Sequence, residues 1–450
     1  MPEPDAPVRE LDDLLLLFHE AETPREDWLI GTEAERIAVQ RPDGAPLPYD
    51  GDISVTSIFS YLIDNHGWEP ERETEDGPIV ALRRGHGSVT LEPGAQIELS
   101  GAPFRTVHEG KEESNAHWRE LGPIIDKLGL VWLGLGCHPF GTVDELARVP
   151  KLRYGVMREY MPTRGPMAAD MMTKTATVQA NLDYASEEDA MRKLRVGLRV
   201  QPLITAMFSN SPWQERRRSG YVSYRALVWQ HMDPDRSGLL PFAWSDRPRY
   251  LDYVQWALDA PMFLVKRGER VLYNTGQTFR SFMEDGFEGT KPTYHDWTVH
   301  LSTLFPEVRL KNTLEYRGAD AQAGELSFAL PAIWKGLLYD ERSLGVLEGW
   351  ADPWSFPEVE RQRDALARHG VRTKFFEREA VDWAGEVLEL AESGLRRLAD
   401  TNGAGEDEAT LLAPLRRLLE KAQTPADALL EQVPEDHPTV EAIIGATALP

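Results

Sequence analysis

Cysteine is almost missing from this chain of 450 residues, which contains Cys137 alone. A single cysteine excludes an intramolecular disulfide, and no cluster of Cys and His has the ligand spacing of a zinc site. Cys137 follows the apolar run Val131–Leu135, so we predict that its thiol is buried. A chain without disulfides is typical of a reducing compartment, and we predict a cytoplasmic location.

Long hydrophobic runs and an excess of positive charge are missing as well. The apolar run Leu14–Leu17 is too short to cross a membrane and is typical of a buried helix face. The first residues are acidic, with no basic segment ahead of an apolar core, so we expect neither a signal nor a transit peptide. The chain has 49 Lys and Arg against 73 Asp and Glu, a formal net charge of −24. This charge argues against nucleic acid or a membrane surface as a partner.

Several motifs of nucleotide and acyl-transfer enzymes are also absent. No GxxxxGK[ST] stretch occurs, which excludes a P-loop nucleotide site at the level of motifs. The protein-kinase signature set and a serine nucleophile elbow are missing too. A nucleotide site in this chain therefore needs a different scaffold.

The stretch from residue 90 to 100 is the strongest positive signal. It reads Thr-Leu-Glu-Pro-Gly-Ala-Gln-Ile-Glu-Leu-Ser. Glu92 precedes a Pro-Gly break, and Gln96 and Glu98 share one face of a strand, because alternate residues point the same way. Unpaired carboxylates this close repel one another, and a hard cation such as Mg²⁺ commonly holds them together.

The same alternation recurs in three other predicted strands, over residues 28–39, 175–183 and 308–317. Their polar faces carry Glu33 and Glu35, then Thr177, Gln179, Asn181 and Asp183, then Arg309, Lys311, Thr313, Glu315 and Arg317. Each one alone is an ordinary amphipathic strand. Together they predict a sheet with one apolar face packed on helices and one polar face that lines a wide cavity.

The fold class that follows is α+β, with an antiparallel sheet, helices on its outer face and a helical C-terminal region. Apolar periodicity predicts helices over 54–66, 104–128 and 187–209. Because the strand motifs are scattered from residue 30 to 317, we predict one catalytic domain over 1–356. A helical extension over 357–450, which lacks any polar-strand motif, would pack on it.

The clustered oxygen groups predict a chemistry. Carboxylate and amide oxygens suit one or more Mg²⁺ ions, which usually share their ligands with substrate phosphates. A polar sheet with such acids and with local clusters of arginine fits an ATP site. In such a site metal ions bridge the phosphates, and arginines stabilise the transferred phosphoryl group.

These segments resemble the plant-type glutamate–cysteine ligases, a family also found in proteobacteria and similar in fold to glutamine synthetase. The resemblance covers roughly residues 28 to 345, and the C-terminal hundred residues match more loosely. The matching segments include Gly-Thr-Glu-Ala-Glu (31–35), Leu-Glu-Pro-Gly-Ala-Gln-Ile-Glu-Leu-Ser-Gly-Ala-Pro (91–103), Thr-Val-Gln-Ala-Asn-Leu-Asp (177–183) and Glu-Tyr-Arg-Gly-Ala-Asp (315–320). The resemblance implies a glutamine synthetase-like fold, with a curved sheet that lines an open active-site cavity.

The resemblance also implies an activity and roles for individual residues. ATP would phosphorylate the γ-carboxylate of L-glutamate, and L-cysteine would attack this γ-glutamyl phosphate, giving γ-glutamylcysteine for glutathione biosynthesis. The implied Mg²⁺ ligands are Glu33, Glu35, Glu92, Gln96, Glu98 and Glu315. Arg153 and Arg225 would hold glutamate, and Thr177, Gln179 and Asn181 would line the floor near ATP and substrate. Arg317 would face the phosphates, with Glu315 beside it as the second catalytic residue.

Two alternatives stay open at this point. Another ATP-dependent carboxylate–amine ligase of the same fold would have the same metal site and a different amine acceptor. A non-catalytic nucleotide-binding protein on this scaffold would bind ATP without turnover. The chain also departs from the plant pattern, since Ala176 and Asn274 stand where we align plant cysteines and Cys137 has no partner. We therefore expect no disulfide switch, and a monomer or a non-covalent dimer.

Overall fold

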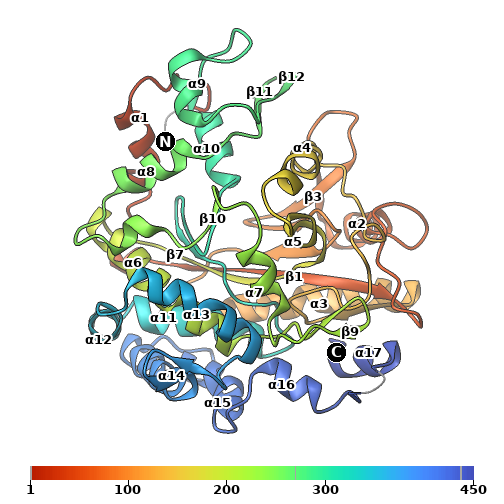
Figure 1. The fold of residues 1–450 in the computed structure, drawn as a ribbon. Helices are drawn as coiled ribbons and strands as arrows, with labels where there is room; N and C mark the ends of the chain where they lie inside the picture. The colour runs from red at the N-terminus through yellow and green to blue at the C-terminus, as the bar shows by residue number, and fades with distance from the viewer. Residues whose placement is uncertain (1–2, 269, 436–437, 450) are drawn as a thin grey trace.

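An antiparallel sheet of long and short strands forms the middle of the molecule, in a computed structural model that describes residues 3–268, 270–435 and 438–449 (Figure 1). Within these residues the strand order is β14-β15-β7-β1-β5-β4-β3-β2, and β6 pairs with the C-terminal part of β1. Every pairing in this sheet is antiparallel. The strands are β1 (Ile30–Gln40), β2 (Glu69–Arg72), β3 (Ile79–Arg84), β4 (Gly87–Leu91), β5 (Ile97–Ser100), β6 (Leu130–Leu133), β7 (Val178–Leu182), β14 (Val308–Leu310) and β15 (Leu314–Tyr316).

Helices cover the apolar side of this sheet, as predicted. Three of them, α3 (Val107–Leu128), α6 (Glu187–Met207) and α11 (Leu326–Leu338), contact its strands directly. In α11 every residue from Ser327 to Leu338 is buried, which is typical of a helix held between two layers. The outer layer on this side is drawn in blue in Figure 1 and consists of α12 (Glu341–Ala351), α13 (Phe356–His369), α14 (Ala380–Leu398) and α15 (Ala413–Leu419).

Smaller elements surround the rest of the sheet (Figure 1). They are α1 (Leu11–His19), α2 (Val55–His66), α4 (Leu152–Tyr160), α5 (Ala168–Lys174), α7 (Tyr224–Gln230), α8 (Tyr250–Asp259), α9 (Phe279–Asp285), α10 (Tyr294–Ser302) and the hairpin β11 (Leu264–Arg267) with β12 (Arg270–Tyr273). A cavity of about 360 Å³ lies among β3, β4, α4, β11 and α10.

The remaining elements are short. They are α16 (Pro425–Leu430), α17 (Val440–Thr447), the ladders β8 (Trp213–Gln214) with β9 (Arg217–Arg218), β10 (Ser237–Gly238) with β13 (Phe305–Pro306) and β16 (Lys374–Phe375) with β17 (Arg378–Glu379), and the 3₁₀ turns η1 (Arg25–Asp27), η2 (Met161–Thr163), η3 (Pro241–Trp244) and η4 (Glu408–Leu412). No helix in the described part of the chain has both the length and the apolar character needed to span a membrane.

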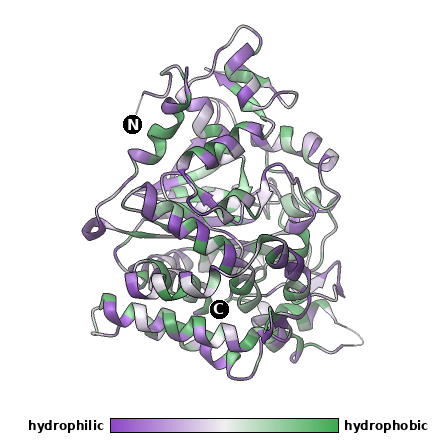
Figure 2. Cartoon of the chain, turned by 60° about the vertical axis from the view of Figure 1, so that its left-hand side comes forward, coloured by the Kyte–Doolittle hydropathy of each residue, from purple (hydrophilic) through white to green (hydrophobic). Residues whose placement is uncertain are grey.

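One hydrophobic cluster crosses the predicted boundary at residue 356. It joins Leu194 of α6 and Trp334 of α11 to Leu366 of α13 and Leu388 of α14. Figure 2 shows hydrophobic and hydrophilic residues side by side along many of the helices, as expected where one face of a helix is buried. The division into 1–356 and 357–450 stays a prediction, and its outer limits, residues 1 and 450, lie outside the described residues.

Two of the predicted strands have a different shape in the structure. Residues 308–317 form a hairpin, in which the turn 311–313 separates β14 from β15, and not one continuous strand. Arg309 lies directly opposite Glu315, so both still share one face. Residues 90–100 divide as well, because Glu92 belongs to a turn and only Ile97–Ser100 forms β5.

Candidate active site

The register of the sheet arranges the polar residues in neighbouring rows. Glu35 of β1 lies directly opposite Glu98 of β5, and Glu33 lies opposite Gln179 of β7. Glu315 of β15 lies opposite Asn181 of β7. Like charges in directly opposed positions destabilise a sheet, so the pairing of Glu35 with Glu98 requires a compensating positive charge.

Three carboxylates meet at this point. One oxygen from each of Glu35, Glu92 and Glu98 lies within 4.8 Å of the other two. Glu35 accepts a hydrogen bond from the Thr177 main-chain N–H at 2.9 Å, and Glu98 accepts one from the Thr90 hydroxyl at 2.9 Å. These bonds use part of the acceptor capacity of the carboxylates and fix their direction.

Burial and mutual repulsion raise the pKa of several of these acids. For Glu35 burial is the larger cause and the carboxylate of Glu92 the second, and together they raise its pKa well above the usual range. The pKa of Glu98 rises for the same two reasons. The pKa of Glu33 rises to about 7, through burial and then through Glu315. A divalent cation would reverse these shifts, because it stabilises the ionised forms.

The turn that carries Glu92 is held tightly against α5. Gly94 has no room for a side chain, since a Cβ atom there would lie 2.1 Å from the Thr173 carbonyl oxygen. The Gln96 side chain accepts a hydrogen bond from the Gly94 N–H at 2.9 Å. Its amide nitrogen donates to the carbonyl oxygens of Thr173 and Thr175, at 3.1 and 2.7 Å. Gln96 was predicted as a metal ligand, but here its amide is engaged with the backbone.

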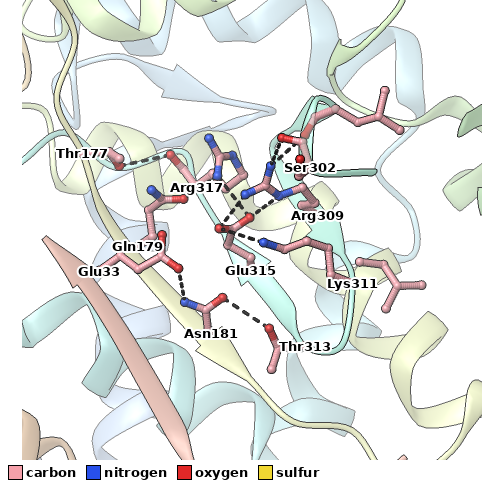
Figure 3. A network of polar contacts seen from close by, with 12 residues as sticks. Glu33, Thr177, Gln179, Asn181, Ser302, Arg309, Lys311, Thr313, Glu315 and Arg317 are labelled. Carbon is pink, nitrogen blue, oxygen red and sulfur yellow. Dashed lines mark hydrogen bonds and ion pairs between the residues drawn. The ribbon is translucent and has the colours of Figure 1, made fainter. Parts of the chain in front are cut away.

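A group of cations surrounds Glu315 (Figure 3). Arg309 forms a two-pronged ion pair with it, in which Nη2 lies 2.9 Å from Oε1 and Nε contacts Oε2. Arg317 Nη1 lies 3.1 Å from Oε2, and Lys311 Nζ lies 4.0 Å from Oε1. Burial opposes ionisation of Glu315, but Arg309 and then the other two cations outweigh it and hold the pKa of Glu315 well below its usual range. Glu315 is therefore an ionised partner of basic groups.

The polar residues of β7 connect the acidic and the basic group. Gln179 accepts a hydrogen bond from Arg317 Nη1 at 2.6 Å, and Asn181 donates to Glu33 at 2.9 Å. The Thr177 hydroxyl donates to the Ala319 carbonyl oxygen at 2.6 Å. These three residues were predicted to line the floor of the site, and the structure places Gln179 and Asn181 in direct contact with its charged groups.

The two predicted glutamate-binding arginines lie in different surroundings. Arg225 is buried at the start of α7, where its guanidinium donates to the main-chain carbonyls of Gly318 and Arg317 at 3.0 and 2.8 Å. Burial lowers its pKa, and the nearby carboxylate of Asp320 partly offsets this. Arg153 lines the 360 Å³ cavity and lies 3.5 Å from the Ser302 hydroxyl.

Four further residues of this region had no role assigned from the sequence: Arg309, Lys311, Lys151 and Tyr154. The first two lay on the predicted polar face, and that placement was the available signal. Lys151 and Tyr154 both donate to the Leu91 carbonyl oxygen, at 2.9 and 2.7 Å, and so support the turn that carries Glu92. No strand alternation marks residues that act from a neighbouring helix.

Comparison with known sequences identifies the family of this chain. The family model described as Glutamate-cysteine ligase family 2 (GCS2) matches residues 29–445. The chain is 39% identical to glutamate–cysteine ligase B, chloroplastic, of Oryza sativa subsp. japonica, over 93% of this chain and 83% of the relative. It is 38% identical to the chloroplastic glutamate–cysteine ligase of Arabidopsis thaliana, over 93% of this chain and 79% of the relative.

Comparison with solved structures concerns the fold alone, because the identities are low. A glutamate–cysteine ligase of Francisella tularensis in complex with AMP aligns with a TM-score of 0.59 and 11% identity, over 93% of this chain and 87% of that one. A bifunctional glutathione synthetase of Pasteurella multocida aligns with a TM-score of 0.54 and 12% identity, over 97% of this chain and 53% of that one. The predicted fold class is confirmed.

The predicted cytoplasmic location is wrong by the comparison with known sequences. The plant relatives are named chloroplastic. The prediction relied on the absence of disulfides, which fits any reducing compartment and selects none of them. By the extent of the family match and the identity to its plant members, this chain belongs to glutamate-cysteine ligase family 2.

Proposed function

We propose that this protein is an ATP-dependent glutamate–cysteine ligase, which joins the γ-carboxylate of L-glutamate to the amine of L-cysteine. The observation that carries the proposal is the pairing of two opposite charge groups on one sheet. Three acids, Glu35, Glu92 and Glu98, lie close enough together to hold a cation. A few strands away, Arg309, Lys311 and Arg317 surround one acid, Glu315. Family membership supports the choice of substrates.

The acidic group fits Mg²⁺. Its ligands are carboxylate oxygens, which Mg²⁺ prefers, and burial together with mutual repulsion raises the pKa of Glu35 and Glu98. We propose Glu35, Glu92 and Glu98 as ligands, with Glu33 next to them. Mg²⁺, when bound there, would neutralise charge on the phosphates of ATP. Gln96 and Glu315 serve this site differently, because the first holds a turn and the second holds cations.

The reaction has two balanced steps. A γ-carboxylate oxygen of glutamate attacks the γ-phosphorus of ATP, the bond to the bridging oxygen breaks, and ADP leaves. The amine nitrogen of cysteine then attacks the acyl carbon, the carbon–oxygen bond to phosphate breaks, and a proton passes from the amine to the departing phosphate. The first step brings two anions together and the second releases an anionic phosphate, so fixed cations lower both barriers by stabilising the negative charge.

The chain's own residues divide this task. Arg309 and Arg317 are oriented by Glu315 and Gln179, so their positive charge is in place before the substrates arrive. Arg153 faces the cavity of about 360 Å³, where we propose that it binds a substrate carboxylate as a two-pronged partner. Arg225 is buried against the 317–318 main chain, next to Arg317. We propose that its positive charge attracts the glutamate substrate.

A ligase with another amine acceptor is the main rival, since its metal and phosphate sites would be the same. The test is phosphate release from ATP with glutamate and a panel of amines: cysteine, 2-aminobutyrate, serine, alanine and ammonia. A glutamate–cysteine ligase gives its highest kcat/KM with cysteine and a product of the mass of γ-glutamylcysteine. The Glu35→Gln variant serves as the background control. A higher kcat/KM with any non-thiol amine would overturn cysteine as the natural acceptor.

A further inference from the structure

Lys311 makes fewer polar contacts through its side chain than the other two cations around Glu315. Arg309 donates to both oxygens of Glu315 and also to the carbonyl oxygens of Ser302 and Leu304, at 3.3 and 3.1 Å. Arg317 Nη1 donates to Gln179 and lies 3.1 Å from Glu315. Within the described residues, the Lys311 ammonium makes no hydrogen bond, and its ion pair with Glu315 spans 4.0 Å. Its three N–H donors are therefore available to a ligand.

The main chain of Lys311 is nevertheless fixed. Its N–H donates to the Thr313 carbonyl oxygen at 2.9 Å, which closes the turn between β14 and β15. Its carbonyl oxygen accepts a hydrogen bond from the buried Tyr184 hydroxyl at 3.0 Å. The fixed main chain therefore positions the side chain of Lys311, while its ammonium group stays free to bind a ligand. Figure 3 shows the ammonium pointing toward Glu315, within the labelled group of polar residues.

Exposure and charge both favour an anionic ligand here. The Lys311 side chain keeps 28% of its surface exposed, whereas Glu315 is fully buried and Arg309 and Arg317 keep 9% and 11%. Three cations surround Glu315, and even with the carboxyl of Glu33 close by they leave an excess of positive charge. The matching ligand is a multiply charged oxyanion, and the proposed reaction supplies one, the phosphoryl group of ATP.

We propose that Lys311 is a further catalytic residue, whose ammonium contacts the non-bridging oxygens of the phosphoryl group during its transfer. This assignment rests on the proposed function. The phosphoryl group moves from the bridging oxygen of ADP to the γ-carboxylate oxygen of glutamate, and its total charge is conserved. A lysine is a compact charge on a flexible stem, so it follows this movement, whereas Arg309 and Arg317 stay in place.

The test is nucleotide binding in the presence of Mg²⁺, measured by calorimetry without amine acceptor. The probes are AMP, ADP and the non-hydrolysable analogue adenylyl imidodiphosphate. Lys311→Met is expected to weaken binding of the analogue by about 10–100-fold, because a charge-assisted hydrogen bond is lost. It should weaken ADP less and leave AMP unchanged. Lys311→Arg should recover part of the lost affinity. The kcat of ligation should be highest in the wild type, lower in Lys311→Arg and lowest in Lys311→Met.

Lys111→Met is the matched control. Lys111 has a similar exposed fraction of 25% and an ion pair with Glu325 at 2.5 Å, but it lies on α3 away from the polar face. Unchanged binding of the analogue in Lys311→Met, or an equal loss for all three nucleotides, would overturn the proposal. Lys311→Gln is measured alongside, so that a folding defect in one variant leaves a second one to decide.

The proposed function and this inference can fail separately. If the wild-type protein releases no phosphate with glutamate and any amine, the proposed function fails. The binding series still decides whether Lys311 contacts the terminal phosphate. If ligation proceeds normally in Lys311→Met, the inference fails and the ligase activity stands.

Discussion

The metal-free protein is expected to lose stability as pH rises, and Glu33 is the residue on which this can be measured. The half-buried carboxyl of Glu33 has a pKa of about 7, against 4.5 for an unperturbed glutamate. Between these two values the folded state holds a proton that the unfolded state has released. The free energy of unfolding therefore falls as pH rises through this window, and the stabilisation is complete only below pH 4.5.

The magnitude follows from the two pKa values. Each unit of pKa difference corresponds to about 1.4 kcal/mol of free energy of unfolding. The window from pH 5 to 8 includes most of the titration, so Glu33 alone lowers the free energy of unfolding by about 2.5 kcal/mol across it. Replacing Glu33 by Gln removes the titrating group and keeps its volume. The Glu33→Gln variant should gain about this much on the wild type between pH 5 and pH 8.

The assay is unfolding by urea at several pH values in the presence of EDTA. A second series with saturating Mg²⁺ should flatten the wild-type profile, because a bound cation stabilises the ionised carboxylates. Glu325→Gln is a control, since Glu325 lies on the surface, where it pairs with Lys111 of α3. Parallel profiles for the wild type and Glu33→Gln would refute the reasoning, and so would a wild-type protein that becomes more stable toward pH 8.

Four other outcomes are expected. Glu35→Gln should raise the Mg²⁺ requirement by about tenfold or more and depress kcat, as seen in activity titrated with Mg²⁺; an unchanged Mg²⁺ curve would remove Glu35 from the site. Gln96→Glu should lower stability by about 1–3 kcal/mol in urea unfolding, because a carboxylate would face two main-chain carbonyls; a tighter Mg²⁺ dependence in this variant would instead make Gln96 a ligand. Arg225→Lys should raise the KM for glutamate and leave that for ATP nearly unchanged, and equal changes in both would contradict a dedicated role. Mild oxidation should leave activity unchanged, because Cys137 is fully buried and burial raises the pKa of its thiol; a covalent dimer on a non-reducing gel would contradict this.

The sequence by itself predicted the sheet and most of its charged face. Alternation places Glu33 with Glu35, and Gln179 with Asn181, on one face of a strand whatever the partners are, because the side-chain period of a strand is two. The buried position of Cys137 followed from its apolar neighbours. The helical nature of the C-terminal region followed from periodicity.

Only the tertiary structure decided which of these polar groups meet. Glu35 faces Glu98 because β1 pairs with β5, and a register shift by one residue would turn one of them to the other side of the sheet. Gln96 and Glu98 look alike in the sequence, but the turn at Gly94 brings the Gln96 amide against the 173–175 main chain, so hydrogen bonding gives them different tasks. The sequence specifies which groups lie on a face, through local backbone geometry. Which of them lie within a few ångströms of each other depends on strand pairing and on contacts between residues that are far apart in the chain.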